Sequence, residues 1–270
     1  MYIKRRRGWE LPESAATPEA VYVNRREFSK GLAAGAVLLA GAGIFAGSGN
    51  AAAEEADPSA KLYPVKRNET YKLDRALTPR DLVTGYNNYY EVGSSKDISD
   101  AAQALPIRPW TVTIDGMVEK PITIGIDDLL ARMPLEERLY RHRCVEAWSM
   151  TVPWSGFAMK ALVGFAMKAL VDFAKPLSSA KYVQMTSFEN PDVAEGQQAN
   201  WYPWPYVEGL TIAEATTDLA FLVTGAYGKP VPKQNGAPLR LATPWKYGFK
   251  SAKGIVRFTF TDKRPMNFWQ

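Results

Sequence analysis

Apolar and polar positions alternate over short stretches of this chain, which is the pattern of half-buried strands. The clearest case is residues 254–260, where Val256, Phe258 and Phe260 alternate with polar neighbours. Similar stretches, interrupted by turn residues, predict further strands at residues 110–116, 181–185 and 239–242. Helices are expected around residues 126–133, 156–173 and 212–217. The sequence therefore predicts an α+β domain of mostly short strands with a few helices.

The N-terminal residues have the order of an export signal. Arg25 and Arg26 are followed by Phe28 and Lys30, then by a Gly- and Ala-rich apolar stretch, and then by small residues up to Ala53. A charged segment, a weakly apolar segment and a small-residue cleavage site predict a cleaved signal at residues 1–53, and the paired arginines indicate the twin-arginine (Tat) route. A retained membrane anchor or a Sec signal are the alternatives. Proteins exported folded often carry a cofactor.

The remaining chain is expected to form one domain at residues 78–270, preceded by an exposed leader at residues 54–77 that is rich in charged residues and proline. The formal charge of +5 includes seven basic and four acidic residues within 1–53, so 26 basic and 24 acidic residues remain and the charge falls to +2. Nucleic acid is therefore not an expected partner. With one histidine, His142, a multi-histidine metal site is excluded.

Residues 156–163 recur without a change as residues 164–171. If both copies were helical, the second copy would lengthen the helix by about 12 Å. It would also rotate the chain that follows by two full turns plus about 80°. The repeat is too short for a solenoid unit. We interpret it as a recent tandem duplication or a sequence error, with a selected feature as the alternative.

Cys144 is the only cysteine, so it cannot form an intramolecular disulfide. An exported thiol without a partner calls for an explanation, which could be a metal, a nucleophilic role or burial as a small apolar side chain. Taken without its neighbours, a lone cysteine is most often simply buried.

The neighbours of Cys144 change that interpretation. Three distant motifs carry a resemblance: Arg143-Cys144-Val145-Glu146-Ala147-Trp148-Ser149, Gln234-Asn235-Gly236-Ala237-Pro238 and Pro244-Trp245-Lys246-Tyr247-Gly248-Phe249-Lys250. In this order they resemble the molybdopterin-containing catalytic subunits of bacterial periplasmic protein-methionine-sulfoxide reductases. The resemblance runs from about Thr78 to Arg264 and agrees with the Tat signal. It implies a sulfite-oxidase-like molybdopterin-binding domain.

The resemblance also implies a set of site residues. Cys144 would be the thiolate ligand of molybdenum, a role that suits a soft donor. The residues implied to bind the molybdenum–molybdopterin cofactor are Asn87, Tyr90, Glu91, Cys144, Ser187, Asn235, Arg240, Ser251, Ala252 and Lys253. Ser187 stands where the family usually has a threonine. The forked donors of Arg240 suit the terminal phosphate, and residues 251–253 match a phosphate-binding turn.

Four further residues near Cys144 are given structural roles. His142 lies two residues before Cys144 and would share its face of a strand, so it could lie near the metal, although a surface or supporting histidine is the more ordinary interpretation. Glu146 is expected to pair with Arg141 or Arg143. Trp148 and Trp154 are expected in the core or the pocket wall.

The implied activity is oxygen-atom transfer from methionine sulfoxide in oxidised periplasmic proteins, which repairs them. Electrons would come from a membrane-embedded haem subunit and the quinone pool, and the Tat machinery would deliver the protein to the periplasm. A sulfite dehydrogenase of the same fold and an inactive, cofactor-free protein are the alternatives. The family continues beyond Pro265, whereas this sequence stops at Gln270, so a truncated end with exposed apolar surface is expected.

Overall fold

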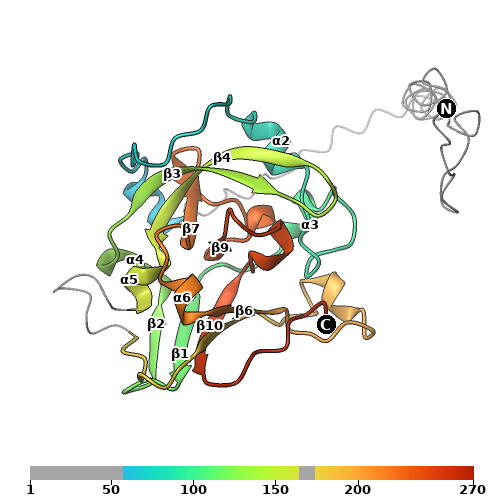
Figure 1. Ribbon diagram of the computed structural model, residues 1–270. Coiled ribbons are helices and arrows are strands. Elements are labelled where there is room, and N and C mark those ends of the chain that lie inside the picture. Colours follow the sequence, from blue (N-terminus) through green and yellow to red (C-terminus); the bar gives the residue numbers. More distant parts are fainter. Residues whose placement is uncertain (1–56, 164–173) are drawn as a thin grey trace, which may run out of the picture. The chain divides into compact units, whose positions relative to one another are not determined.

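The computed structural model describes residues 57–163 and 174–270 (Figure 1). The predicted export signal, the first residues of the predicted leader and the second copy of the repeat lie outside the described residues. Residues 55–270 form one compact unit. Within the described residues, no helix combines the length and the apolar character needed to span a bilayer.

The first of two sheets has five strands in the order β2-β1-β10-β5-β6. β1 runs parallel to β10, and the other neighbours are antiparallel. This sheet occupies the lower half of the view in Figure 1. Its strands are β1 (Thr111–Gly116), β2 (Ile122–Gly125), β5 (Tyr182–Ser187), β6 (Val207–Thr211) and β10 (Ile255–Thr261).

The second sheet is antiparallel throughout and lies in the upper half of Figure 1, where β3 and β4 form a long curved hairpin. The hairpin pairs Glu136 with Gly156 at one end and Arg143 with Ser149 at the other. Cys144 is therefore the first residue of the loop that joins the two strands. The strands are β3 (Glu136–Arg143), β4 (Ser149–Ala158), β7 (Phe221–Ala226), β8 (Lys229–Pro230) and β9 (Arg240–Ala242).

The helices among the described residues are all short, and three of them, α4, α5 and α6, lie in connections between the two sheets. The α-helices are α2 (Arg80–Gly85), α3 (Ser99–Ala102), α4 (Ile126–Arg132), α5 (Met159–Val163) and α6 (Ile212–Ala215). The 3-10 turns are η2 (Pro58–Leu62), η3 (Glu195–Gln198), η4 (Lys233–Asn235) and η5 (Gly248–Lys250). Mostly short strands with few short helices confirm the predicted fold class.

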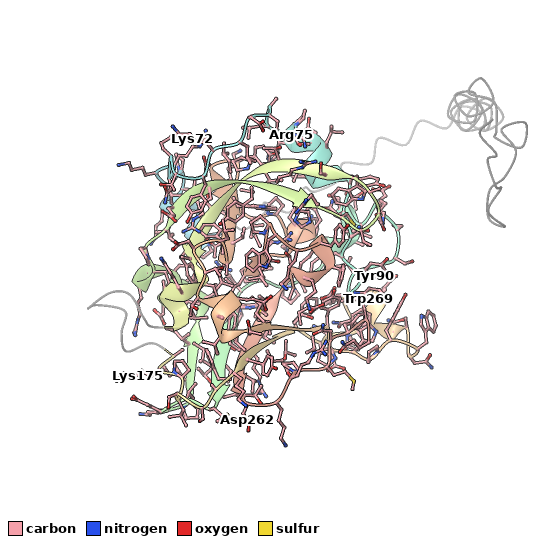
Figure 2. All side chains as sticks on the ribbon, in the orientation of Figure 1. Lys72, Arg75, Tyr90, Lys175, Asp262 and Trp269 are labelled. Carbon is pink, nitrogen blue, oxygen red and sulfur yellow. The ribbon has the colours of Figure 1, made fainter. Side chains whose placement is uncertain are left out.

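Buried side chains form two apolar cores, and side chains fill the space between the strands (Figure 2). The larger core joins the first sheet to α4 through residues such as Ile114, Leu129 and Phe258. The smaller core belongs to the second sheet and includes Trp154 and Phe221. Strands of both sheets pack on these cores, and the ends and connecting loops of the strands form the site described below.

Two sequence expectations are corrected by the strands. The helix expected to begin at residue 156 begins at Met159, because residues up to Ala158 continue β4 and Phe157 pairs with Leu222 of β7. An apolar run alone does not distinguish a buried strand from a helix. In β10, Ile255 is buried and Val256 is only partly so, because the pairing register shifts between Ile255 and Arg257.

The other predicted elements agree more closely. The strands expected at 110–116, 181–185, 239–242 and 254–260 correspond to β1, β5, β9 and β10, and the helix expected at 126–133 corresponds to α4. α6 ends two residues earlier than expected, at Ala215, and begins with a capping box between Thr211 and Glu214.

Candidate active site

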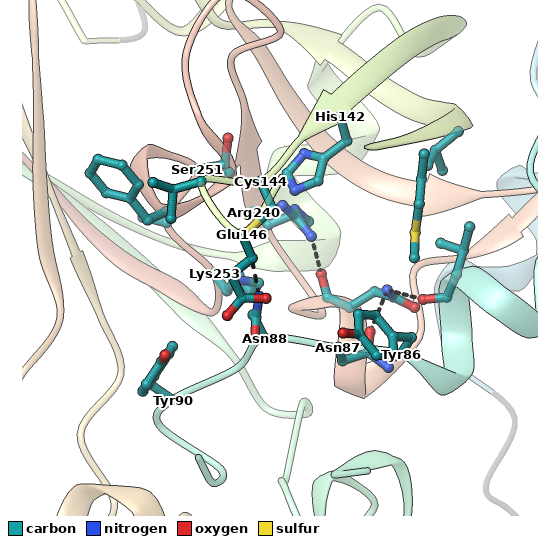
Figure 3. Close-up of a pocket in the computed structure, with 18 of the residues that line it drawn as sticks. Tyr86, Asn87, Asn88, Tyr90, His142, Cys144, Glu146, Arg240, Ser251 and Lys253 are labelled. Carbon is teal, nitrogen blue, oxygen red and sulfur yellow. Dashed lines mark hydrogen bonds between the residues drawn. The ribbon is translucent and has the colours of Figure 1, made fainter. Parts of the chain in front are cut away.

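A cavity of about 330 Å³ brings together segments that are far apart in the sequence. The loop after α2, the β3–β4 hairpin, the residues from η4 to β9 and the segment around η5 all contribute side chains (Figure 3). Nine of the ten predicted cofactor-binding residues line this cavity: Asn87, Tyr90, Glu91, Cys144, Asn235, Arg240, Ser251, Ala252 and Lys253. Their roles in binding a cofactor remain predictions.

Ser187 is the predicted residue that does not line the cavity. It ends β5 and is buried. Its hydroxyl lowers the pKa of the Glu91 carboxyl, which burial raises more strongly. Among the described residues, neither the Ser187 hydroxyl nor Glu91 Oε1 has a hydrogen-bond partner, and Ser187 stays outside the cavity wall.

Cys144 is held by a tight turn at the tip of the β3–β4 hairpin. The amide of Cys144 donates to the carbonyl of Trp148 at 2.9 Å, and the amide of Ala147 donates to the carbonyl of Cys144 at 3.2 Å. Ala147 adopts a φ of 68°, in the left-handed region that closes such turns. The cysteine side chain is 8% exposed and its sulfur faces the cavity (Figure 3).

A cluster of hydrogen-bonded polar side chains lies on one side of the Cys144 sulfur. Asn88 Nδ2 donates to Cys144 Sγ at 3.6 Å and to Glu146 Oε2 at 3.2 Å. Lys96 Nζ donates to both Asn88 Oδ1 and Glu146 Oε1, and Trp148 Nε1 donates to Glu146 Oε2. The hydrogen bond from Lys96, joined by those from Trp148 and Asn88, lowers the pKa of Glu146 to about 2. The expected pairing of Glu146 with Arg141 or Arg143 is therefore wrong, because Lys96 is its partner.

Arg240 places a buried guanidinium in the cavity wall. It is 3% exposed, and its Nη1 donates to the carbonyl of Asn235 at 2.8 Å. Among the described residues its Nη2 has no hydrogen-bond partner, and neither has the buried Oδ1 of Asn235. Burial lowers the pKa of Arg240 to about 10. A buried donor without a partner costs stability unless a ligand satisfies it, so this wall fits an anion.

A second cation lies beside Arg240. Lys253 Nζ is 5.5 Å from the centre of the Tyr89 ring, and burial together with repulsion by Arg240 lowers the pKa of Lys253 to about 8. Glu91 attracts this lysine, but burial raises the pKa of the Glu91 carboxyl. The inner part of the cavity therefore has an excess of positive charge, which suits a phosphate.

His142 lines the same cavity as Cys144, as the strand argument predicted. Burial, together with the nearby charges of Arg240 and Lys253, lowers the pKa of His142 to about 3, so the imidazole is neutral at pH 7. The expectation that Trp148 and Trp154 form core or pocket wall is confirmed, because both line the cavity.

Four lining or supporting residues were missed from the sequence: Asn88, Lys96, Tyr206 and Trp269. Asn88 adjoins Asn87 and could have been included with that loop. Trp269 lies near Tyr90 in Figure 2, with ring centres 5.2 Å apart, and its Nε1 donates to Tyr206 Oη at 2.9 Å. No motif among the last residues indicated that they would reach the site.

The C-terminal residues contact β6 and the aromatic side chains beside it. Phe268 is buried and stacks on Tyr206 with ring centres 4.5 Å apart. The amide of Phe268 donates to the carbonyl of Val207 at 2.9 Å, which fixes this segment along β6. Met266 and Trp269 remain exposed.

The site fits a molybdenum–molybdopterin cofactor. Cys144 supplies one soft donor, and the described residues contain no group of three His, Cys, Asp or Glu side chains able to hold a metal alone. The unsatisfied Arg240 Nη2 and Asn235 Oδ1 offer a donor and an acceptor to such a cofactor.

Comparison with known proteins agrees with this geometry. Residues 100–269 match the family model described as the oxidoreductase molybdopterin binding domain. Among solved structures, the chain is similar to the sulfane dehydrogenase SoxCD from Paracoccus pantotrophus, with 18% identity and a TM-score of 0.52 over 71% of this chain. The match spans 45% of the SoxCD chain, and at this identity it shows the fold alone. The chain belongs to the family of oxidoreductases with a molybdopterin-binding domain, and it has the expected sulfite-oxidase-like fold.

Proposed function

We propose that this protein is a molybdenum-dependent reductase of methionine sulfoxide in exported proteins. The observation that carries the proposal is the combination of a cavity-facing thiol, Cys144, with a buried guanidinium, a second cation at Lys253 and an apolar mouth. The cofactor, when bound, supplies two-electron oxygen-atom transfer at sulfur. Cys144 would hold its metal.

The organic part of the cofactor would be held by the opposite wall. Arg240 Nη2 would donate to the terminal phosphate, and Lys253 would add a cation. In the turn at Ser251, Ala252 and Lys253, the amide of Ser251 already donates to the carbonyl of Gly248 at 3.0 Å, so the amides of Ala252 and Lys253 would supply the backbone donors. Asn87 Oδ1 accepts from Asn235 Nδ2 at 2.9 Å, which fixes both amides for hydrogen bonds to a pterin. Tyr90 and Glu91 line the same part of the cavity.

The mouth favours a neutral, partly apolar substrate. Its exposed large side chains are Tyr86, Val145, Phe249 and Trp269. Glu146 is the exposed acid there, and Lys96 compensates its charge. An enzyme for the sulfite anion would be expected to have exposed lysine or arginine side chains at the mouth. Among the described lining residues, no lysine or arginine is exposed. A methionine side chain, by contrast, makes favourable contacts between sulfur and aromatic rings.

The setting of the activity follows from the family resemblance and from the N-terminal sequence. The paired Arg25 and Arg26 support export of the folded, cofactor-loaded protein by the Tat machinery to the periplasm. Electrons would come from a membrane-embedded haem subunit that draws on the quinone pool. Oxidised periplasmic proteins would be the substrates.

Turnover by the molybdenum-loaded full chain tests the proposal. The protein is expressed with an intact Tat pathway and assayed on a methionine-sulfoxide peptide with a reduced viologen dye, and on sulfite with an oxidised dye. Reduction of the sulfoxide with negligible sulfite oxidation is the expected result. Turnover of sulfite alone would favour the sulfite dehydrogenase, and a folded protein without molybdenum would favour the inactive alternative.

A further inference from the structure

We propose that Lys96 is a positioning residue that turns the Asn88 amide toward the Cys144 sulfur and thereby raises the reduction potential of the metal centre. The inference rests on the proposed role of Cys144 as metal ligand. Asn88 would donate a hydrogen bond to that ligand, and Lys96 would fix the direction of this bond.

The contacts start from the loop between α2 and α3, which carries Asn88 and Lys96. Asn88 Nδ2 lies 3.6 Å from Cys144 Sγ and 3.2 Å from Glu146 Oε2. On the other side of the same amide, Oδ1 accepts from Lys96 Nζ. Figure 3 shows Asn88 and Glu146 together near Cys144.

The chemistry of these neighbours allows one orientation of the amide. An ammonium group only donates hydrogen bonds, so Asn88 Oδ1 must face Lys96. An ionised carboxylate and a thiolate only accept, so Nδ2 must face Glu146 and Cys144. The inverted amide would place NH₂ against the ammonium and oxygen against two acceptors. Lys96 and Glu146 therefore determine together which atom the sulfur meets.

Lys96 is itself well anchored for this role. Its Nζ is 2.7 Å from Glu146 Oε1, and the two side chains are 29% and 34% exposed. Its carbonyl accepts from the amide of Asn87 at 3.1 Å, which closes the loop on itself. Glu146 is held in turn by Trp148 Nε1. A half-buried pair with several partners holds its geometry better than an exposed ion pair.

A hydrogen bond to a metal-bound thiolate withdraws electron density from the sulfur. It therefore stabilises the reduced metal relative to the oxidised metal and raises the reduction potential. Loss of Asn88 Nδ2 should lower the potential. Loss of Lys96 should lower it through Asn88, because the amide is then free to rotate away.

The test measures the molybdenum midpoint potential of the loaded full chain, by redox-poised EPR of the Mo(V) signal, together with the metal content. Asn88→Leu removes the amide, Lys96→Met removes the ammonium and keeps the stem, and Lys96→Arg restores a cation. Lys120→Met, an exposed lysine between β1 and β2, is the matched control. Each lysine variant is also combined with Asn88→Leu.

Asn88→Leu is expected to change the one-electron equilibrium at least about tenfold toward the oxidised form, which corresponds to about 59 mV for one electron. Lys96→Met should shift the potential in the same direction, Lys96→Arg should restore most of it, and Lys120→Met should leave it unchanged. In the Asn88→Leu background, Lys96→Met should add little. An equal shift in both backgrounds would show that Lys96 acts only as a charge, and would overturn the inference.

The outcomes separate this inference from the proposed function. Unchanged potentials in loaded Asn88→Leu overturn the inference and leave sulfoxide reduction standing. Shifted potentials in a protein that does not reduce methionine sulfoxide overturn the proposed substrate and leave the positioning role standing. A wild-type protein that takes up no molybdenum would overturn both.

Discussion

Gly248 lies directly against the imidazole of His142, where a Cβ atom would be 2.6 Å from Nε2 and 3.0 Å from Cε1. Gly248 begins η5, the turn that leads into the predicted phosphate-binding residues, and His142 precedes the Cys144 loop. The two predicted halves of the cofactor site therefore meet at this contact.

Gly248→Ala should push the two segments apart. Overpacking of this kind costs about 1–3 kcal/mol, and we expect the variant to lose that much unfolding free energy and part of its molybdenum content. Urea unfolding and metal analysis measure both. Gly85→Ala, at a position where a Cβ would meet nothing within 4 Å, is the control. Unchanged stability in Gly248→Ala would mean that this contact does not constrain the site.

His142 should make the cofactor-free protein less stable in acid. Its pKa is about 3 in the folded chain against an ordinary 6.5, so between these values the unfolded chain binds a proton that the folded chain does not. The free energy of unfolding should therefore fall as the pH falls from 6.5 toward 3, by up to about 1.4 kcal/mol per unit. In urea titrations from pH 7 to 4, His142→Gln should lack this part of the slope. Equal slopes in both proteins would contradict a neutral imidazole in the folded chain.

Arg240→Gln should separate cofactor retention from folding. The wild-type guanidinium is buried with Nη2 unsatisfied, so its removal should leave the thermal midpoint of the cofactor-free chain unchanged or raise it. Loss of this charged phosphate donor should lower retained pterin and molybdenum by about tenfold or more. Fluorescence of the oxidised pterin measures retention, and Arg257→Gln, an exposed arginine of β10, is the control. A variant that retains its cofactor would contradict the phosphate role.

Site residues that belong to distinctive motifs could be predicted from the sequence, whereas those that only the fold brings to the site could not. Cys144 and Asn235 were predicted because each lies in a long, distinctive motif, and Arg240 was predicted because it closely follows one of these motifs. Lys96 was not predicted, because it reaches the site only through the fold of its loop, and an isolated lysine carries no local signal. The partner of Glu146 was misassigned to nearby arginines for the same reason.

The fold shows a similar limit. Strand β10 was predicted from its alternation, but the register shift that buries Ile255 depends on the partner strand β5. The start of α5 was predicted too early because residues 156–158 are apolar, which is compatible with a buried strand and with a buried helix. Their pairing with β7 assigns them to the strand. Local patterns therefore predict elements, while pairing and burial set their ends.

Trp269→Ala should weaken substrate binding at the mouth. Trp269 is 43% exposed, lines the cavity and packs on Tyr90, so its ring is available to a sulfoxide-bearing side chain. A contact between sulfur and an aromatic ring is worth about 0.3–1.5 kcal/mol, so KM for a methionine-sulfoxide peptide should rise by about twofold to tenfold with kcat little changed. Trp201→Ala removes a ring that is 76% exposed and does not line the cavity, and should leave KM unchanged. An equal effect in both variants would argue against a specific contact.

The molybdenum content of Cys144→Ser, compared with that of the wild-type chain, is the most direct test that this cavity is a molybdenum site. Both proteins are purified after Tat-dependent expression, and metal and pterin are measured per chain. The wild-type chain should carry about one molybdenum, and Cys144→Ser should keep its fold but lose at least about nine-tenths of the metal, because a hydroxyl is a poor substitute for a soft thiolate. Full molybdenum in folded Cys144→Ser would contradict ligation by Cys144.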